Sequence, residues 1–326
     1  MSRYTAYGLL IESELPLPEL RPDGQLADVS IRRGSIQLPA GGPAGDRQRW
    51  VRDGVVYLSC RRRGALRIAA GSEILVSPAP GADERIIRNW VLGQGLGIIM
   101  HQRGFLVLHA SAVEFEKSAV VFVGGSGSGK STLALAMCRQ GHGVLSDDYA
   151  VISTAPDPPL VQGGFPQLKL RPDSLAGLGA ASPQSTGHRV SEEKLGWNIQ
   201  AQFAAGPLPL RAVYVLRSGD AAGIVEIPAG AAPAELARHS FLAASLSASE
   251  VSADWLGRCA ELAAKVRVAM LQRPTQFDGL PDLVRLTKGD LERHTEETTP
   301  GGVRPRRAAP AGVRTHSRPE PESVPD

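Results

Sequence analysis

The chain has 326 residues, with 36 Lys and Arg against 33 Asp and Glu, which gives a net charge of +3 at pH 7. A charge this small, without a basic patch rich in aromatic residues, argues against nucleic acid as a partner. The hydrophobic content of 42% and the charged content of 21% are ordinary for a globular protein, and the length allows one large domain with a smaller one.

Three scattered cysteines without a C-x-x-C pair predict neither a disulfide framework nor a zinc site. Residues 1–30 carry acids and prolines and lack the apolar segment of a signal peptide. The sequence has no run of about 18 apolar residues, the length that a membrane span needs. We therefore expect a cytoplasmic protein with no membrane partner.

Residues 1–85 alternate short strand-like segments with turns rich in Gly and Pro, which predicts a small β-rich N-terminal region. The expected strands are residues 6–11, 28–32, 55–60, 65–69 and 74–76. Apolar side chains then recur at helical spacing and predict a helix over residues 83–102.

Residues 104–113 form an apolar segment in which His109 and Ser111 are the polar residues, and the pattern predicts a strand. A lone histidine in such a strand is usually a core residue whose hydrogen bonds are satisfied. The residues of this segment alone therefore give His109 no catalytic role.

Residues 124–132 match the phosphate-binding loop (P-loop) motif G-x-x-x-x-G-K-[ST] in full. The residues are Gly124, Gly125, Ser126, Gly127, Ser128, Gly129, Lys130, Ser131 and Thr132. An apolar run at 119–123 predicts a buried strand before the motif, and residues 131–140 predict a helix after it, as the motif requires.

Each part of this loop has a role in holding a nucleotide. Glycines let backbone N–H groups turn toward phosphate oxygens, and the following helix adds partial positive charge. Lys130 would reach the β- and γ-phosphates, and the Ser131 hydroxyl would bind Mg²⁺. The sequence thus predicts ATP or GTP binding; a chance glycine turn is the alternative.

Two adjacent carboxylates, Asp147 and Asp148, lie in a further predicted strand, residues 143–152. The short distance from Lys130 leaves room for one helix, so we expect this segment to be the very next strand of a right-handed βαβ unit. Side chains alternate along a strand, so one carboxylate can face Mg²⁺ and phosphate while the other is held by neighbours or meets the acceptor. A loop pair that only solvates a turn is the alternative.

The remaining pattern predicts a P-loop domain over residues 86–295. Its expected elements are a buried strand at 210–216, helices at 234–246 and 255–264, and a late strand at 266–271. Residues 296–326 are rich in proline and charge and contain no aromatic residue, so we expect a disordered tail that buries too little apolar surface to order itself.

His109, the P-loop and the pair Asp147-Asp148 occur in the order and spacing of the catalytic domain of the HPr kinase/phosphorylase family, whose members phosphorylate a serine of a small carrier protein. Residues 108–113 and 145–148, together with the opening at 7–20, look more like the branch that phosphorylates the C-terminal serine of lasso precursor peptides. The likeness spans most of residues 4–290 and is specific around 104–152. It implies an α/β fold: a P-loop, HPr-kinase-like catalytic domain with a small β-rich N-terminal region and a disordered C-terminal tail.

The resemblance implies a role for each matched residue. Lys130 and the loop would hold the nucleotide phosphates, and Ser131 would hold Mg²⁺. Asp148 would accept the proton of the attacked serine hydroxyl, and His109 would be an active-site histidine. The chemistry of phosphoryl transfer, apart from the resemblance, makes Asp147 a metal-site candidate that would orient Lys130 or a metal-bound water.

Two further family residues are harder to place. The family's metal-binding glutamate belongs to a glycine-rich signature that this sequence lacks, and an ungapped count from the loop reaches Asp173 instead. Asp173 is therefore a candidate second metal ligand, with a turn aspartate after a proline as the alternative. Arg189 is the candidate for the family's late active-site arginine.

The chemistry favours a kinase independently of the resemblance, because phosphoryl transfer needs a metal, charge neutralisation and a carboxylate near the acceptor. We expect a kinase that uses ATP and Mg²⁺ and acts on a serine of a peptide or small protein, by resemblance a lasso-type precursor peptide. The alternatives are an HPr-like protein serine kinase/phosphorylase and a nucleotide-dependent sensor without transfer activity. Assembly into a homo-oligomer is left open.

Overall fold

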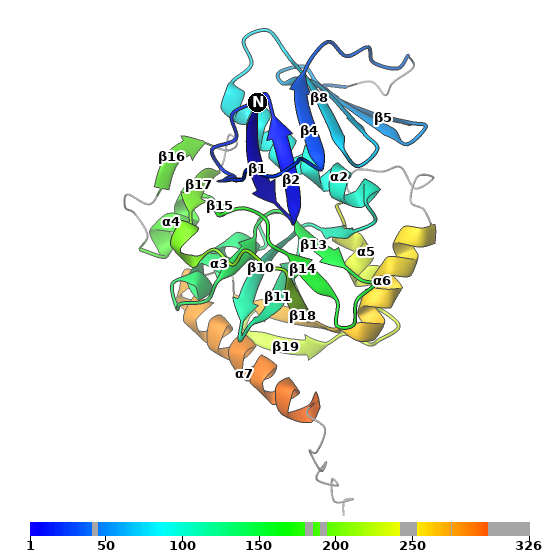
Figure 1. Ribbon diagram of the computed structural model, residues 1–326. Helices are drawn as coiled ribbons and strands as arrows, with labels where there is room; N and C mark the ends of the chain where they lie inside the picture. Colours follow the sequence, from blue (N-terminus) through cyan, green and yellow to red (C-terminus); the bar gives the residue numbers. More distant parts are fainter. Residues whose placement is uncertain (41–44, 180–184, 190–193, 242–252, 275, 299–326) are drawn as a thin grey trace, which may run out of the picture. The chain divides into compact units, whose positions relative to one another are not determined.

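The computed structural model describes residues 1–40, 45–179, 185–189, 194–241, 253–274 and 276–298, which form a mixed α/β structure (Figure 1). The chain divides into a compact unit of residues 1–288 and a second unit that begins at Gly289. Helix α7 (Leu280–Thr298) continues into the segment predicted as a tail, and residues 299–326 lie outside the described residues. The predicted domain boundary between residues 85 and 86 stays a prediction.

Residues 2–78 form an eight-stranded sheet in the order β3-β1-β2-β4-β8-β7-β6-β5. The strands are β1 (Ser2–Ala6), β2 (Leu9–Ser13), β3 (Arg21–Pro22), β4 (Val29–Arg33), β5 (Arg47–Arg52), β6 (Val55–Cys60), β7 (Gly64–Ala69) and β8 (Glu73–Pro78). The single strand predicted over residues 6–11 is wrong. Tyr7 and Gly8 take positive φ angles of 54° and 73° and turn the chain, so β1 and β2 form an antiparallel hairpin.

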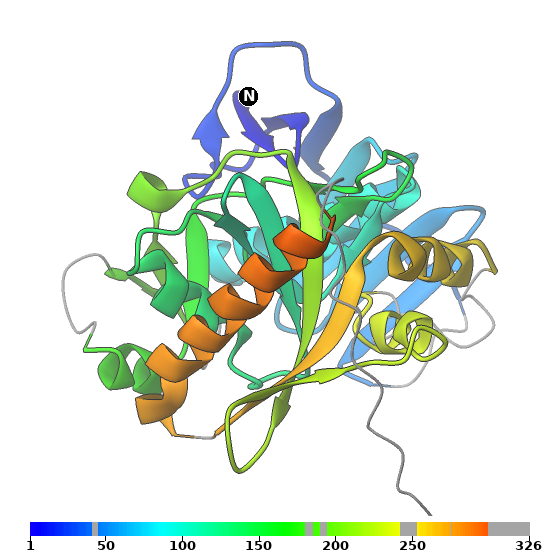
Figure 2. The ribbon, with the colours of Figure 1, turned by 90° about the horizontal axis from the view of Figure 1, so that it is seen from below.

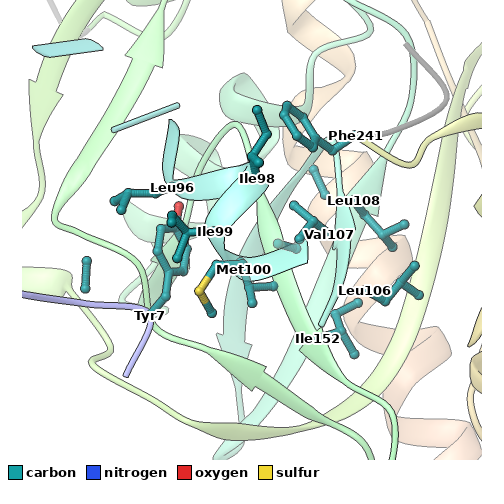
Figure 3. Packing of buried hydrophobic residues seen from close by; sticks show 14 of the residues in the cluster. Tyr7, Leu96, Ile98, Ile99, Met100, Leu106, Val107, Leu108, Ile152 and Phe241 are labelled. Atoms are coloured by element: carbon teal, nitrogen blue, oxygen red, sulfur yellow. The ribbon is translucent and has the colours of Figure 1, made fainter. Parts of the chain in front are cut away.

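The helix predicted over residues 83–102 is confirmed as one continuous helical segment. It consists of α1 (Glu84–Trp90), a π-helical turn η1 (Val91–Gly95) and α2 (Leu96–Gln102). The side chain of Asp83 accepts the N–H of Arg85 and caps the segment at its start. Figure 3 shows α2 side chains packed in one buried cluster with Leu106, Val107 and Ile152 of the next sheet. The same cluster includes Tyr7, so it joins the N-terminal sheet to the sheet that carries the candidate site.

The second sheet has nine strands, and seven of them follow the order β12-β10-β11-β18-β14-β13-β9. The strands are β9 (Leu106–Leu108), β10 (Ala110–Phe115), β11 (Ser118–Val123), β12 (Val144–Ser146), β13 (Ala150–Ser153), β14 (Leu160–Gln162), β18 (Leu208–Ser218), β19 (Gly223–Glu226) and β20 (Arg267–Arg273). Strand β20 pairs with β18, beside which it lies in Figure 2, and β19 pairs with β20. Strands β11, β18 and β20 are parallel and confirm the buried strands predicted before the P-loop, at 210–216 and at 266–271.

Helices accompany this sheet at the predicted places, with different bounds. Helix α3 (Lys130–Cys138) follows β11, and α5 (Ala232–Arg238) and α6 (Ala253–Lys265) lie in the connection from β18 to β20. Helix α5 ends before the predicted residue 246, and residues 242–252 lie outside the described residues. No helix in the described part of the chain combines the length and the apolar run that a bilayer crossing needs.

The two predicted strands that hold the candidate catalytic residues are each broken in two. His109 alone separates β9 from β10, and Asp147–Tyr149 separate β12 from β13. Asp148 has a φ of 67°, in the left-handed region, and this interrupts the strand predicted over 143–152. Strand β12 is parallel to β11, but β10 pairs with both and lies between them, so β12 is not the neighbour of β11.

These breaks force the nine-stranded sheet to curl on itself. In the strand order β9 and β13 lie at one end, and β10 and β12 lie at the other. One linking residue spans at most about 7 Å, so the two ends must lie side by side. The N–H of Ala110 accordingly donates to the carbonyl of Asp148, at 3.2 Å. We call the two linkers, His109 and residues 147–149, the seam of the sheet.

A small antiparallel sheet with the order β15-β17-β16 contacts the seam through Lys169. It was not predicted, and its strands are β15 (Gln167–Leu170), β16 (Ser185–Arg189) and β17 (Leu195–Asn198). Helix α4 (Pro172–Gly177) follows β15, and the short 3-10 helices η2 (Gln200–Gln202) and η3 (Phe277–Gly279) complete the described elements.

Candidate functional site

The P-loop connects the buried strand β11 to the first residue of α3. Gly124, Gly127 and Gly129 have φ angles of 156°, 79° and 94°, which L side chains rarely adopt. The N–H of Leu133 donates to the carbonyl of Gly129, so the helix starts directly at the end of the loop. The sequence thus builds a turn at a helix N-terminus, the arrangement that holds phosphate groups.

Lys130 is buried and bonded to its own loop. Its ammonium group donates to the carbonyls of Gly124 and Gly125, at 2.9 and 3.0 Å. Burial lowers the pKa of this lysine to about 8. Anionic phosphate oxygens entering the loop would compete with these carbonyls for the ammonium group and favour its charged form.

Asp147 is buried and accepts three hydrogen bonds. Its Oδ1 accepts from the hydroxyl of Ser111 at 2.6 Å and from that of Ser131 at 2.9 Å, and its Oδ2 accepts the N–H of Lys169 at 2.7 Å. The hydroxyl of Ser131, which the motif assigns to Mg²⁺, therefore donates a hydrogen bond to the Asp147 carboxylate.

This donor set fits Mg²⁺. The Ser131 hydroxyl and the Asp147 carboxylate supply hard oxygen ligands, and Mg²⁺ in nucleotide sites uses one or two carboxylates together with substrate phosphates. The described residues contain no group of three His, Cys, Asp or Glu side chains that would hold a metal by themselves. Ser131 and Asp147 would thus hold the ion together with a nucleotide.

Asp148 lies between two lysines. Its carboxylate is 2.6 Å from the ammonium of Lys169 and 3.8 Å from that of Lys194. Burial by itself raises the pKa of Asp148, but the two lysines outweigh burial and hold it well below its usual range. Asp148 is therefore ionised at neutral pH, and its positive φ places it at a strained point of the backbone.

His109 crosses the seam from β9 to β10. Its backbone N–H donates to the carbonyl of His239 at 2.7 Å, and its ring meets the Tyr149 ring edge to face, with centroids 6.2 Å apart. Burial, together with the nearby charge of Lys130, lowers the pKa of His109 to about 4. The imidazole is therefore neutral at pH 7, so one ring nitrogen can donate a hydrogen bond and the other can accept one.

One pocket of about 70 Å³ brings most of these side chains together. Its lining consists of residues His109, Ser126, Gly127, Gly129, Lys130, Ser131, Thr132, Asp148, Lys169, Leu170, Arg171, Ser174 and Lys194. The predicted residues His109, Lys130, Ser131 and Asp148 thus share one cavity. Asp147 is not part of its lining and contacts it through Ser131.

Of the remaining candidates, Asp173 is not brought to this pocket. Asp173 lies in the first turn of α4 with an exposed side chain, and its Oδ1 accepts the N–H of Ser174 at 2.8 Å. This bond is local to the start of α4 and gives Asp173 no contact with the loop. Arg189 is the last residue of β16, and its side chain lies outside the described residues.

Sequence reasoning missed four cations near the loop: Lys169, Arg171 and Lys194, which line the pocket, and Arg273 at the end of β20. The Nε of Arg273 donates to the carbonyl of Ser128 at 2.5 Å, so this guanidinium supports the loop from outside. A single signal pointed to Lys169, a charged residue within the apolar segment of β15. Its partner Asp148 is distant in sequence, so local pattern gave no indication of the contact.

Among solved structures, the chain is similar to the Hpr(Ser) kinase/phosphatase from Coxiella burnetii, with 12% sequence identity and a TM-score of 0.31. The match covers 58% of this chain and 98% of that one. No protein-family model matches the sequence, and no curated protein does. The structural likeness is weak and does not extend to a substrate or to the precursor-kinase branch.

Proposed function

We propose that the protein is an ATP- and Mg²⁺-dependent kinase that transfers the γ-phosphoryl group to a serine hydroxyl of a peptide. The observation that carries the proposal is the hydrogen bond between Ser131 and Asp147, next to a pocket that Asp148 and Lys130 line together. The metal-side carboxylate of Asp147 and the acceptor-side carboxylate of Asp148 are thus adjacent in sequence, and only Asp147 bonds the loop serine among the described contacts.

The nucleotide side consists of the loop amides, Lys130, Ser131 and Asp147. The amides and the ammonium group of Lys130 would bind the phosphates, and Ser131 and Asp147 would hold Mg²⁺. When bound, the ion would supply neutralisation of the charge that develops on the phosphate oxygens. Arg273, through its bond to the Ser128 carbonyl, keeps the loop in shape for this binding.

The acceptor side consists of Asp148, with Lys169, Lys194 and His109 around it. In the transfer, the serine oxygen forms a bond to the γ-phosphorus, the bond from that phosphorus to the β–γ bridging oxygen breaks, and ADP leaves. The hydroxyl proton passes to Asp148 and then to solvent. The low pKa of Asp148 makes it a weak base, and a loose transition state needs orientation of the hydroxyl more than early proton removal.

A peptide is the acceptor that suits the size of this pocket. Asp148 shares its pocket of about 70 Å³ with the P-loop, so the room beside a bound phosphate suits a small side chain such as that of serine, and a flexible segment presents such a side chain more easily than a folded surface does. The sequence resemblance adds the finer expectation of a lasso-type precursor peptide, with an HPr-like carrier protein and its phosphorylase reaction as the alternative.

One observation favours a second candidate, a nucleotide-dependent sensor without transfer activity. Asp148 is already engaged by Lys169 at 2.6 Å, so the carboxylate must share or exchange this partner before it can orient a hydroxyl. A sensor would bind Mg²⁺ and nucleotide and would leave that ion pair intact.

Incubation with γ-³²P-labelled ATP and Mg²⁺ separates these functions. We expect label on the serine of a peptide and none with a Lys130→Ala variant as the control. Label only on folded carrier proteins would favour the HPr-like alternative. Tight nucleotide binding without label on any acceptor would overturn the kinase proposal and support the sensor.

A further inference from the structure

A second pocket lies at the edge strand of the N-terminal sheet and shares no lining residue with the pocket at the P-loop. Its volume is about 320 Å³, and we call it the arginine pocket. Its lining consists of Arg47, Gln48, Arg49, Leu58, Ser59, Cys60, Arg63, Trp90, Gln94, Ile98 and Phe241. Strand β5, which supplies three of these residues, is the last strand in the order of its sheet.

The lining combines positive charge with an apolar wall. The described residues of the lining include three arginines and neither Asp nor Glu. The guanidinium of Arg63 lies over the Trp90 ring, 5.8 Å from its centroid, so this cation is held at the wall. Leu58, Ile98 and Phe241 are buried and line the same pocket. Carboxylates next to apolar side chains are complementary to such a surface.

Aromatic contacts connect this wall to the candidate active site. The Phe241 ring meets the Tyr149 ring edge to face, with centroids 5.0 Å apart, and Tyr149 in turn meets His109. Tyr149 directly follows Asp148 in the seam. Figure 3 shows Phe241 beside Ile98 and close to Leu108, the residue before His109. Two ring contacts in series thus lead from Phe241 in the arginine pocket to His109 in the candidate active site.

We propose that the arginine pocket binds an acidic segment of the peptide acceptor, in which carboxylates alternate with apolar side chains. The identity of this occupant rests on the proposed function. The volume is at the lower end of the range of about 300–1,000 Å³ seen for ligand pockets, which suits a few side chains of an extended segment. The acceptor is then held at two places, and its serine needs little affinity of its own for the small pocket near the P-loop.

Binding is tested directly on the full chain with a fluorescein-labelled peptide that alternates glutamate with leucine, read by fluorescence anisotropy. The control peptide alternates lysine with leucine. We expect the acidic peptide to bind more tightly and to be weakened by salt. Arg63→Glu and Arg47→Glu should each weaken its binding about tenfold or more, because a like charge replaces an attractive one. Arg47 is exposed, so its variant keeps the test valid if Arg63→Glu fails to fold.

The matched control is Arg52→Glu, which makes the same charge change on the same strand outside the pocket lining. Equal losses for Arg52→Glu and Arg47→Glu would overturn the proposal, and so would equal binding of the two peptides. Binding of citrate but not of the acidic peptide would assign the pocket to a small anion and also overturn it.

A phosphoryl-transfer assay distinguishes a failure of this inference from a failure of the proposed function. A serine peptide with the acidic segment should be phosphorylated at a lower KM than the same peptide without it, and Arg47→Glu should abolish the difference. If no peptide accepts phosphate while the acidic peptide still binds in an arginine-dependent way, the proposed function fails and the binding site stands.

Discussion

The ammonium group of Lys169 lies 2.6 Å from the carboxylate of Asp148, while the backbone N–H of the same lysine donates to Asp147. One residue of a small separate sheet therefore holds both carboxylates of the acid pair. The side chain of Lys169 is 6% exposed and that of Asp148 is 20% exposed, so their ion pair is largely shielded from water. This arrangement fixes how far apart the metal side and the acceptor side of the candidate site lie.

Replacing the two lysines near Asp148 should have unequal effects on stability. Lys169→Met leaves a buried carboxylate without its close partner and should lower the free energy of unfolding by about 3 kcal/mol. Lys194→Met is the control: this lysine is 3.8 Å away and 30% exposed, and its loss should cost less than about 1 kcal/mol. Urea denaturation measures both, and Asp148→Asn added to Lys169→Met should restore part of the loss. Equal destabilisation by the two single variants would contradict this account of the ion pair.

Substitutions of Asp147 and Asp148 should affect nucleotide affinity and phosphoryl transfer differently. Asp148→Asn should abolish phosphoryl transfer and leave Mg²⁺·ATP affinity within a few-fold, because Asp148 has no bond to the loop serine. Asp147→Asn should weaken nucleotide binding as well, because its Oδ1 accepts from both Ser111 and Ser131. Titration calorimetry with Mg²⁺·ATP, beside a transfer assay, distinguishes the two. Equal losses of affinity would show that these roles are wrongly divided.

Nucleotide binding should take up a proton at Lys130. Burial lowers the pKa of the free lysine to about 8, and bound phosphates favour its charged form and raise that pKa. Above pH 8 a growing fraction of free protein must therefore be protonated on binding, so affinity should fall as the pH rises from 8 to 9. Calorimetry in two buffers of different ionisation enthalpy measures the uptake, which Lys130→Met should abolish. Wild-type binding without proton uptake at pH 8.5 would refute the prediction.

Two loop glycines offer a matched test of the contact with Arg273. Gly127→Ala and Gly129→Ala both place a side chain at positive φ, a strain of about 1–2 kcal/mol. A Cβ at Gly127 would meet no atom within 4 Å, whereas one at Gly129 would lie 3.0 Å from the guanidinium of Arg273. Gly129→Ala should therefore weaken Mg²⁺·ATP binding more than Gly127→Ala, because it also displaces the group that holds the Ser128 carbonyl. Nucleotide titrations of both variants decide this, and equal weakening would deny Arg273 a supporting role.

The local sequence pattern was sufficient to predict an element where a motif or an apolar run dominated the segment. The P-loop motif with its apolar strand predicted β11 and α3, because glycines at positive φ and a buried strand leave few other conformations. The apolar segments at 210–216 and 266–271, each interrupted by one arginine, likewise gave the parallel strands β18 and β20.

The breaks at the seam could not be predicted in the same way. Residues on both sides of His109 are apolar and buried, so the sequence shows one unbroken run although β9 and β10 belong to opposite ends of the sheet. Asp148 adopts positive φ in place of a glycine, and nothing in its neighbours signals this turn. Contacts between distant segments, such as that of Lys169 with Asp148, depend on the curl of the sheet. The spacing of apolar residues in the sequence does not indicate them.

The seam has a consequence for how the protein responds to a ligand. His109 and Asp148 lie in linkers that are tied at both ends to hydrogen-bonded strands, and Ala110 binds the carbonyl of Asp148 across the join. Moving this backbone would require separating the two ends of the sheet, so we expect a ligand to be accommodated by rotation of long side chains. Lys130 can leave the loop carbonyls and Lys169 can leave Asp148 without any strand shifting. We therefore expect the backbone around the site to stay in place on nucleotide binding, and the two ammonium groups to change partners.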